Sequence, residues 1–151
     1  MSQPHPWDGL SPDRAHIWNT LGYRRVDASE GRAAIEWDAT PEYSFPDGDR
    51  TIVHGGMVAT LLDTAMGHVC VERLGWGDNF LTADLHVEFY RAAAPGTLRA
   101  EAEVVHQSKR AVFCAASLYD PKGTLLASAR CTQIVRGGKN LFPTDASSPA
   151  A

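Results

Sequence analysis

The stretch from Gly56 to Leu74 is the feature that most limits how this chain can fold. Between Met57 and Val71 it carries a single formal charge, Asp63. A helix that is apolar on nearly all sides has to be buried, and a helix of this length extends over roughly 28 Å. The sequence therefore predicts a long central helix, which the rest of the chain must surround.

After this helix the hydrophobic pattern changes to a period of two, which is typical of strands. On residues 81–90, Leu81, Ala83, Leu85, Val87 and Phe89 share one face and alternate with polar side chains. Further strands are predicted for residues 98–104, 111–119 and 124–135, with a type I turn at Asp120–Gly123. The pattern predicts an antiparallel meander that packs against the helix, and thus an α+β fold.

The segments before the central helix carry weaker signals. Ser11 is a good N-cap for a short helix that ends at Gly22. A strand is predicted within residues 24–38 and a loop over residues 42–49.

The 151 residues suffice for one domain. We expect this domain to comprise residues 11–136, between flexible tails at 1–10 and 137–151. Gly75 and Gly77 are expected to stop the central helix.

The composition excludes several functional classes. Fourteen basic and 18 acidic side chains give a net charge of −4, which argues against nucleic acid as a partner. Cys70, Cys114 and Cys131 are far apart and odd in number, so no disulfide framework is expected. We see neither a secretory signal nor an apolar run long enough to span a bilayer. The chain is therefore expected to be cytoplasmic, without a membrane partner.

Gly55 and Gly56 stand where a loop meets the central helix. Glycines let the backbone pass close to a ligand, and a helix N-terminus exposes unpaired N–H groups at the positive end of its dipole. Such donors can stabilise an oxyanion. The alternative is that both glycines only permit a tight turn.

Asp63 is the second candidate, because a carboxylate on a buried helix is costly unless it is paired or used. It lies beyond the first helical turn, so the helix dipole does not explain it. The alternative is a structural aspartate that bonds to the backbone, Thr60 or Thr64. A metal site with His54 and His68 is not expected, since the spacing from Asp63 to His68 misses the i, i+4 positions of one helix face.

His54-Gly55-Gly56, followed nine positions after His54 by the Asp63 of Leu62-Asp63-Thr64-Ala65, carries a family resemblance. It resembles the signature of hotdog-fold acyl-CoA thioesterases of the phenylacetyl-CoA (PaaI-like) type. The resemblance covers residues 24–135. It implies an antiparallel sheet wrapped around the long helix, hydrolysis of an acyl- or aryl-acyl-CoA thioester without a cofactor, and a homodimer or homotetramer with sites at the dimer interface.

The resemblance also implies a role for each matching residue. The Gly55 N–H would polarise the thioester carbonyl, with Gly56 beside it in the substrate site. Asp63 from the partner subunit would act as general base or nucleophile, and Thr82 would position the attacking water. His54 would support the loop or the oxyanion site.

Three cations are candidates for binding the phosphates of coenzyme A: Arg91, Lys109 and Arg110. The alternative is ordinary solvated charge.

One departure from the family pattern keeps other functions open. Relatives of this type commonly carry Asn or Gln six residues before the histidine, and this chain has Gly48 there. A hotdog protein that binds acyl-CoA without turnover is therefore the main alternative. A hydratase or dehydratase is a weaker one, because the chain lacks an Asp-x-Asn-Pro-x-x-His pattern.

Overall fold

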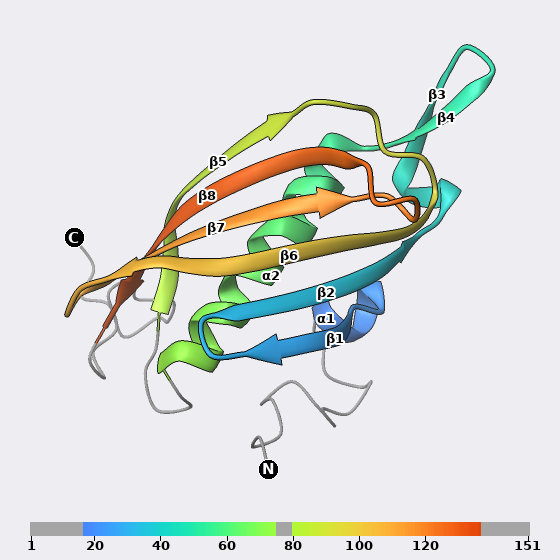
Figure 1. Cartoon of the computed structure of the whole chain (residues 1–151). Coiled ribbons are helices and arrows are strands. Elements are labelled where there is room, and N and C mark those ends of the chain that lie inside the picture. Colours follow the sequence, from blue (N-terminus) through green and yellow to red (C-terminus); the bar gives the residue numbers. More distant parts are fainter. Residues whose placement is uncertain (1–16, 75–79, 137–151) are drawn as a thin grey trace, which may run out of the picture.

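The computed structural model describes residues 17–74 and 80–136 of the chain. In this part, a six-stranded antiparallel sheet curves around the long helix α2 (Gly55–Leu74), and a two-stranded ribbon projects near the start of that helix (Figure 1). The predicted α+β architecture, an antiparallel sheet wrapped around a central helix, is confirmed. The remaining elements are α1 (Ile17–Leu21), β1 (Arg24–Ser29), β2 (Arg32–Ala39), η1 (Pro41–Tyr43), β3 (Ser44–Asp47), β4 (Arg50–Val53), β5 (Phe80–Phe89), β6 (Gly96–Gln107), β7 (Ala111–Tyr119) and β8 (Leu125–Val135).

The strand order differs from the predicted simple meander. β6, β7 and β8 are neighbours in chain order, but β5 pairs with β8 and not with β6, so the order is β1-β2-β6-β7-β8-β5. The connection over residues 90–95 crosses the ends of β8 and β7. Three strand spacings amount to about 14 Å, and this connection reaches roughly 20 Å when extended. β5 thus forms one edge of the sheet.

Two segments before α2 are hairpins. The strand predicted within residues 24–38 is confirmed as β2, and a second strand, β1, pairs with it. β1 and β2 pair around Glu30 and Gly31, and Gly31 has a φ of 74°. β3 and β4 pair around Gly48, whose φ is 64°, where a loop was expected over residues 42–49. Both turns use the left-handed backbone that glycine adopts readily. Strands of only four to six residues are too short to show a clear alternation.

The other described elements agree with the prediction. α2 begins one residue before its predicted start, and β7 has the predicted bounds. α1 ends before Gly22, which has a φ of 74°. In the turn before β8 the Asp120 carbonyl accepts the Gly123 N–H at 3.0 Å. The predicted helix start at Ser11, the helix stop at Gly75 and Gly77 and both tails lie outside the described residues.

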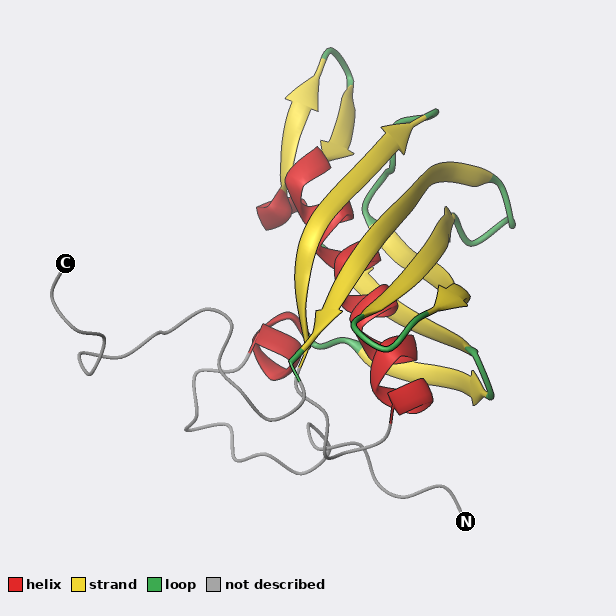
Figure 2. Ribbon diagram, turned by 90° about the vertical axis from the view of Figure 1, so that its left-hand side faces the viewer, coloured by secondary structure: helices red, strands yellow, loops and turns green. Residues whose placement is uncertain are grey.

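The sheet turns its concave side toward α2 (Figure 2), and the core residues lie between the two. Only one side of α2 is fully covered by its own chain, because the side that carries Thr60, Asp63, Thr64 and Gly67 is half-buried. None of the described helices is long and apolar enough to span a membrane. The core includes the following residues with no exposed surface: Ile35, Leu61, Leu62, Ala65, Met66, Val69, Leu98, Ala100, Val112 and Leu118.

β5 is more exposed than its apolar side chains would suggest. Leu81, Leu85 and Phe89 keep 38%, 39% and 55% of their surface accessible. A long apolar edge strand offers unpaired backbone groups to any other strand, and proteins usually cover such an edge. The single chain therefore leaves both an apolar edge and the Asp63 side of α2 incompletely covered.

Candidate functional site

The N-terminus of α2 is arranged by His54. Its Nδ1 atom accepts the Gly56 N–H at 2.9 Å, and its carbonyl oxygen accepts the Met57 N–H at 2.9 Å. An accepting Nδ1 places the ring proton on Nε2. His54 thus acts as the N-cap of the helix. The Gly55 N–H has no acceptor within residues 17–74 and 80–136, and this is the donor that a ligand can use.

An apolar pocket of about 290 Å³ opens beside Gly55. A Cβ atom on Gly55 would lie 3.5 Å from the Phe89 ring, so the backbone of this residue faces the pocket closely. Arg91 is the charged residue among those that line it. The other lining residues are Phe45, Ile52, Val53, Val58, Phe89, Tyr90, Ala92, Ala93, Leu118, Leu126 and Ala127.

Asp63 lies in the middle of α2 and accepts a hydrogen bond of 2.9 Å from the Thr82 hydroxyl. Burial raises the pKa of its carboxyl group, and the bond from Thr82 partly opposes that shift. The Thr60 and Thr64 hydroxyls donate to backbone carbonyls one turn earlier in the helix. The alternative that one of these threonines holds Asp63 is therefore wrong.

An irregularity in β5 turns Thr82 toward Asp63. The register between β5 and β8 shifts between Thr82 and Asp84. Thr82 and Val87 both face the helix side, where they contact Asp63 and the core, although five positions separate them. In a regular strand they would lie on opposite faces. The predicted single apolar face from Leu81 to Phe89 is wrong for this reason, since bulges re-aim side chains next to functional sites.

Gly55 and Asp63 do not meet within one chain. Eight positions on α2 separate them, which corresponds to about 12 Å along the helix axis. A base or nucleophile has to lie about 3 Å from the reacting atom. The Gly55 N–H and the Asp63 carboxyl group of one chain therefore cannot act on the same reacting group.

The three predicted phosphate-binding cations do not form one group within the chain. The backbone N–H of Arg91 donates to the Leu126 carbonyl at the start of β8. The backbone carbonyl of Arg110 accepts the Val135 N–H at the end of that strand. A strand of this length spans roughly 35 Å. Arg91 therefore lines the apolar pocket, while Lys109 and Arg110 lie at the opposite end of the sheet.

A comparison with known families shows which class of enzyme carries this arrangement. The family model that describes the thioesterase superfamily matches residues 51–127, which run from β4 into β8 and include Gly55, Asp63 and Thr82. The chain belongs to the thioesterase superfamily. It is accordingly a hydrolase that acts on thioesters.

Individual proteins show the same similarity. This thioesterase is 32% identical over 130 residues to a Halobacterium salinarum protein that bears the name "Putative esterase", and the match covers 83% of both chains. Its structure matches the E. coli PaaI protein from the phenylacetic acid degradation operon with a TM-score of 0.72 and 25% identity, over 81% of this chain and 85% of that one. A Haemophilus influenzae thioesterase shares the fold, with a TM-score of 0.75, 16% identity and coverage of 85% and 88%. The predicted resemblance to PaaI-like thioesterases is confirmed.

Sequence reasoning missed one polar residue of the thioesterase. Gln133 on β8 has no exposed surface, and its Oε1 atom lies 3.1 Å from the Thr82 hydroxyl that contacts Asp63. A signal was present, because Ala127, Ala129 and Cys131 precede it at inward positions of the same strand. A polar residue at the next inward position requires a polar partner.

Gly48, which replaces the usual Asn or Gln of PaaI-like thioesterases, lies at the tip of the β3–β4 hairpin. Its φ of 64° suits a glycine, and a Cβ atom there would meet no other atom within 4 Å. The β3–β4 hairpin projects beyond the N-terminal end of α2, whereas Asp63 lies in the middle of that helix (Figure 1).

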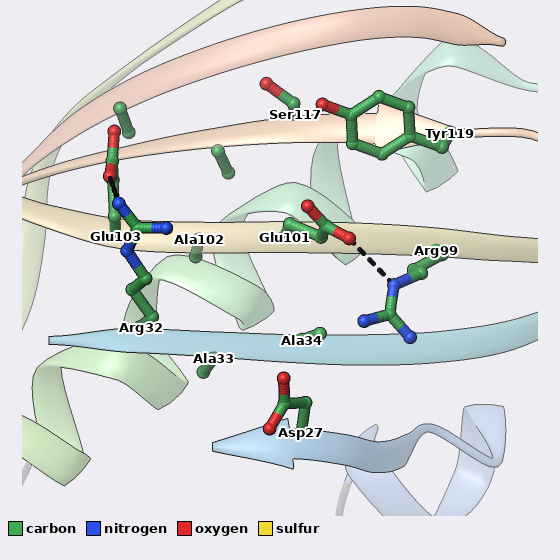
Figure 3. A pocket seen from close by; sticks show the side chains of 12 residues that line it. Asp27, Arg32, Ala33, Ala34, Arg99, Glu101, Ala102, Glu103, Ser117 and Tyr119 are labelled. Atoms are coloured by element: carbon green, nitrogen blue, oxygen red, sulfur yellow. Dashed lines mark hydrogen bonds and ion pairs between the residues drawn. The ribbon is translucent and has the colours of Figure 1, made fainter. Parts of the chain in front are cut away.

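A second hollow, of about 300 Å³, lies over β2, β6 and β7 on the sheet face that points away from α2 (Figure 3). Its rim carries the ion pairs Arg32–Glu103 and Arg99–Glu101, with N–O distances of 3.6 and 2.9 Å. None of the predicted catalytic residues lines it. The pocket beside Gly55 is therefore the better candidate for the thioesterase site.

Proposed function

We propose that this protein hydrolyses acyl-CoA thioesters with an apolar acyl or aryl-acyl group to the free acid and coenzyme A. The observation that carries the proposal is the Gly55 N–H at the wall of an apolar pocket, where none of the described residues accepts it. An apolar acyl chain gains from burial there, and its carbonyl oxygen can accept the N–H. The direct test is the release of free thiol from a panel of acyl-CoAs that differ in acyl size and aromaticity.

Asp63 supplies the chemistry in this proposal. As a general base, it takes a proton from water, the water oxygen bonds to the carbonyl carbon, and the C–S bond breaks so that coenzyme A leaves as a thiol. As a nucleophile, its carboxylate oxygen bonds to the carbonyl carbon, the C–S bond breaks and coenzyme A leaves as a thiolate; water then hydrolyses the resulting anhydride to the free acid and the Asp63 carboxylate. Thr82 holds the carboxyl group or the water in either case. The two routes are alternatives, and Gly55 stabilises the developing oxyanion in each.

The proposal requires two chains, since the donor and the acid of one chain lie too far apart. The edge strand β5 offers the route, because Phe89 lies beside Gly55 and Thr82 contacts Asp63. If two copies of β5 pair antiparallel, with Thr82 opposite Phe89 of the partner subunit, each acid approaches the helix N-terminus of the other chain. This pairing would also cover the apolar edge. We therefore propose a homodimer, which can associate further into a tetramer.

We expect the protein to be a dimer or a larger oligomer by light scattering at micromolar concentration. Leu85→Lys places a charge in the middle of the apolar edge, so we expect it to shift the protein toward monomer and to remove hydrolysis together with the dimer. Val105→Lys is the matched control, since Val105 is 64% exposed on β6, away from β5. A wild-type protein that is monomeric and active would contradict the shared site.

The proposed pairing of two β5 strands would also bring Arg91 of one chain close to Lys109 and Arg110 of the other. Arg110 lies beside Val135, which pairs with Phe80 at the start of β5. The register that sets Thr82 opposite Phe89 also sets Phe80 opposite Arg91 of the partner subunit. Lys109 and Arg110 of one chain would then approach the partner's Arg91, at the mouth of the acyl pocket. We propose that this group binds phosphates of coenzyme A.

Removing all three charges (Arg91→Ala, Lys109→Ala and Arg110→Ala) should weaken acyl-CoA binding about tenfold at low salt and flatten its salt dependence. The measurement is titration calorimetry at several ionic strengths with a catalytically inactive Asp63→Asn background. Lys122→Ala, in the turn before β8, is the control for a loss of surface charge. Unchanged affinity in the triple variant would show that the three cations are only solvated surface.

A second candidate function is binding of acyl-CoA without turnover. Gly48 favours it, because the family's usual amide at that position is missing. Calorimetry and thiol release on the same sample separate the two functions. Tight binding with no thiol release for any acyl group would favour the binding protein.

A further inference from the structure

A buried amide on β8 lies next to the hydrogen bond between Thr82 and Asp63, the proposed catalytic residue. Gln133 has no exposed surface, and its side chain lies between the Thr82 hydroxyl and the Cys131 thiol. The Thr82 oxygen is 3.1 Å from Gln133 Oε1 and 2.9 Å from Asp63 Oδ1, and Gln133 Nε2 donates to Cys131 Sγ at 3.3 Å. A continuous series of hydrogen bonds therefore connects Asp63 on α2 with the core of the sheet.

The number of hydrogens on these groups limits which of the hydrogen bonds can form at the same time. A threonine hydroxyl has one hydrogen to donate, and here it faces two oxygens that can accept it. If Asp63 is ionised, Thr82 has to donate to the carboxylate, and a Gln133 oxygen on its other side would face a lone pair. If Asp63 carries a proton, the carboxyl group can donate to Thr82, and Thr82 to Gln133.

We propose that Gln133 is a positioning residue for Asp63, whose amide holds the Thr82 hydroxyl in place in both protonation states of that carboxyl group. With protonated Asp63, the carboxyl group donates to Thr82 and the Gln133 oxygen accepts from Thr82, across the 3.1 Å that separate the two oxygens. With ionised Asp63, the amide turns by 180°, its N–H donates to Thr82, and its oxygen accepts the Cys131 thiol hydrogen. The role in hydrolysis rests on the proposed function, whereas the hydrogen-bond coupling does not.

Burial raises the pKa of Asp63 and so favours its protonated form, which brings both protonation states into the range where this coupling acts. Two other titratable groups act on the same region, Tyr23 before β1 and Cys131 on β8. Burial raises the pKa of Tyr23, while the neighbouring Cys114 and burial raise that of Cys131. Both stay neutral while Asp63 titrates, so the change of charge at this place belongs to Asp63.

The coupling can be tested in the intact protein by NMR with labelled carboxyl carbons and side-chain amides. The Gln133 side-chain amide signals should change with the same midpoint as the Asp63 carboxyl carbon, and this change should be absent in Asp63→Asn. Amide signals of Gln133 that stay constant through the Asp63 titration would overturn the proposal. This measurement needs neither a Gln133 variant nor an active enzyme.

Gln133→Met, which has a similar shape, and Gln133→Leu should raise the pKa of Asp63 by about half a pH unit or more. Without the Gln133 amide, the hydrogen bonds to the ionised carboxylate lose more stabilisation than those to the protonated carboxyl group, because hydrogen bonds to a charged group are stronger. In a Thr82→Val background, neither Gln133 variant should shift the pKa of Asp63 further. Val112→Ala is the control, because Val112 is a buried apolar residue on β7 that lies opposite Gln133. It should lower stability without moving the pKa.

In hydrolysis, Gln133→Met should lower kcat about tenfold with an unchanged KM, and it should move the acid limb of the pH profile to higher pH. Equal losses in the Thr82 and Thr82→Val backgrounds would overturn the positioning role. If wild-type protein releases no thiol, the proposed function fails, and the NMR titration still decides the coupling of Gln133 to Asp63.

Discussion

Replacing Asp63 with asparagine should lower thioester hydrolysis by about 10²- to 10⁴-fold, the usual contribution of a general base, or by more if the carboxylate is the nucleophile. An amide neither takes the proton of water nor attacks a thioester as a carboxylate does. It still accepts the hydrogen bond from Thr82 and leaves no cavity. The fold should therefore remain intact.

The melting temperature of Asp63→Asn should equal or exceed that of the wild type at neutral pH. Burial raises the pKa of Asp63 in the folded chain, so stability falls as pH rises from the ordinary aspartate pKa to the raised one. Asparagine does not ionise, so the Asp63→Asn variant avoids this loss of stability. Thr82→Ala should cost less activity than Asp63→Asn, because it removes only positioning. A stable Asp63→Asn variant with near-normal hydrolysis would contradict the catalytic assignment.

Gly55→Pro should lower hydrolysis by about 10²- to 10³-fold, which is the usual cost of losing one oxyanion donor. Proline has no N–H, yet it fits the first position of a helix, where Gly55 stands. Gly55→Ala is the matched control. It keeps the N–H, and its Cβ atom would meet the Phe89 ring at 3.5 Å, an ordinary contact distance. Similar losses in both variants would show that space, and not the donor, matters at this position.

The two inactive variants also test whether each site uses two chains. A dimer of one Asp63→Asn chain and one Gly55→Pro chain would contain one site with both native residues. Co-expression should therefore restore roughly a quarter of the wild-type activity if chains pair at random. Restoration to no more than the level of either variant alone would place both residues in a single-chain site.

The sequence predicts the parts of this fold that depend on local pattern. The long stretch with Asp63 as its only central charge predicts α2 within one residue, and the offset from His54 to Asp63 predicts the family. The neighbours of β5 could not be predicted, because alternation reveals which face is buried but not which strand lies alongside.

The relation between Thr82 and Gln133 also required the structure. The bulge in β5 reverses which side chains face the helix, and nothing in an alternating pattern marks where one extra residue is inserted. From sequence alone Gln133 is indistinguishable from an ordinary polar strand residue, because its partner Thr82 comes from another strand. The assignment of Arg91 and Lys109 to one group likewise could not be made from strand ends alone.

The apolar pocket and the acid draw on different parts of the molecule. Phe45 and Ile52 come from the exposed β3–β4 hairpin, whereas Asp63, Thr82 and Gln133 are joined between α2 and the sheet. Loops at the surface accept changes of sequence and length more readily than packed interiors do. We therefore expect that changes in the hairpin can alter which acyl groups are accepted without disturbing the proposed catalytic residues.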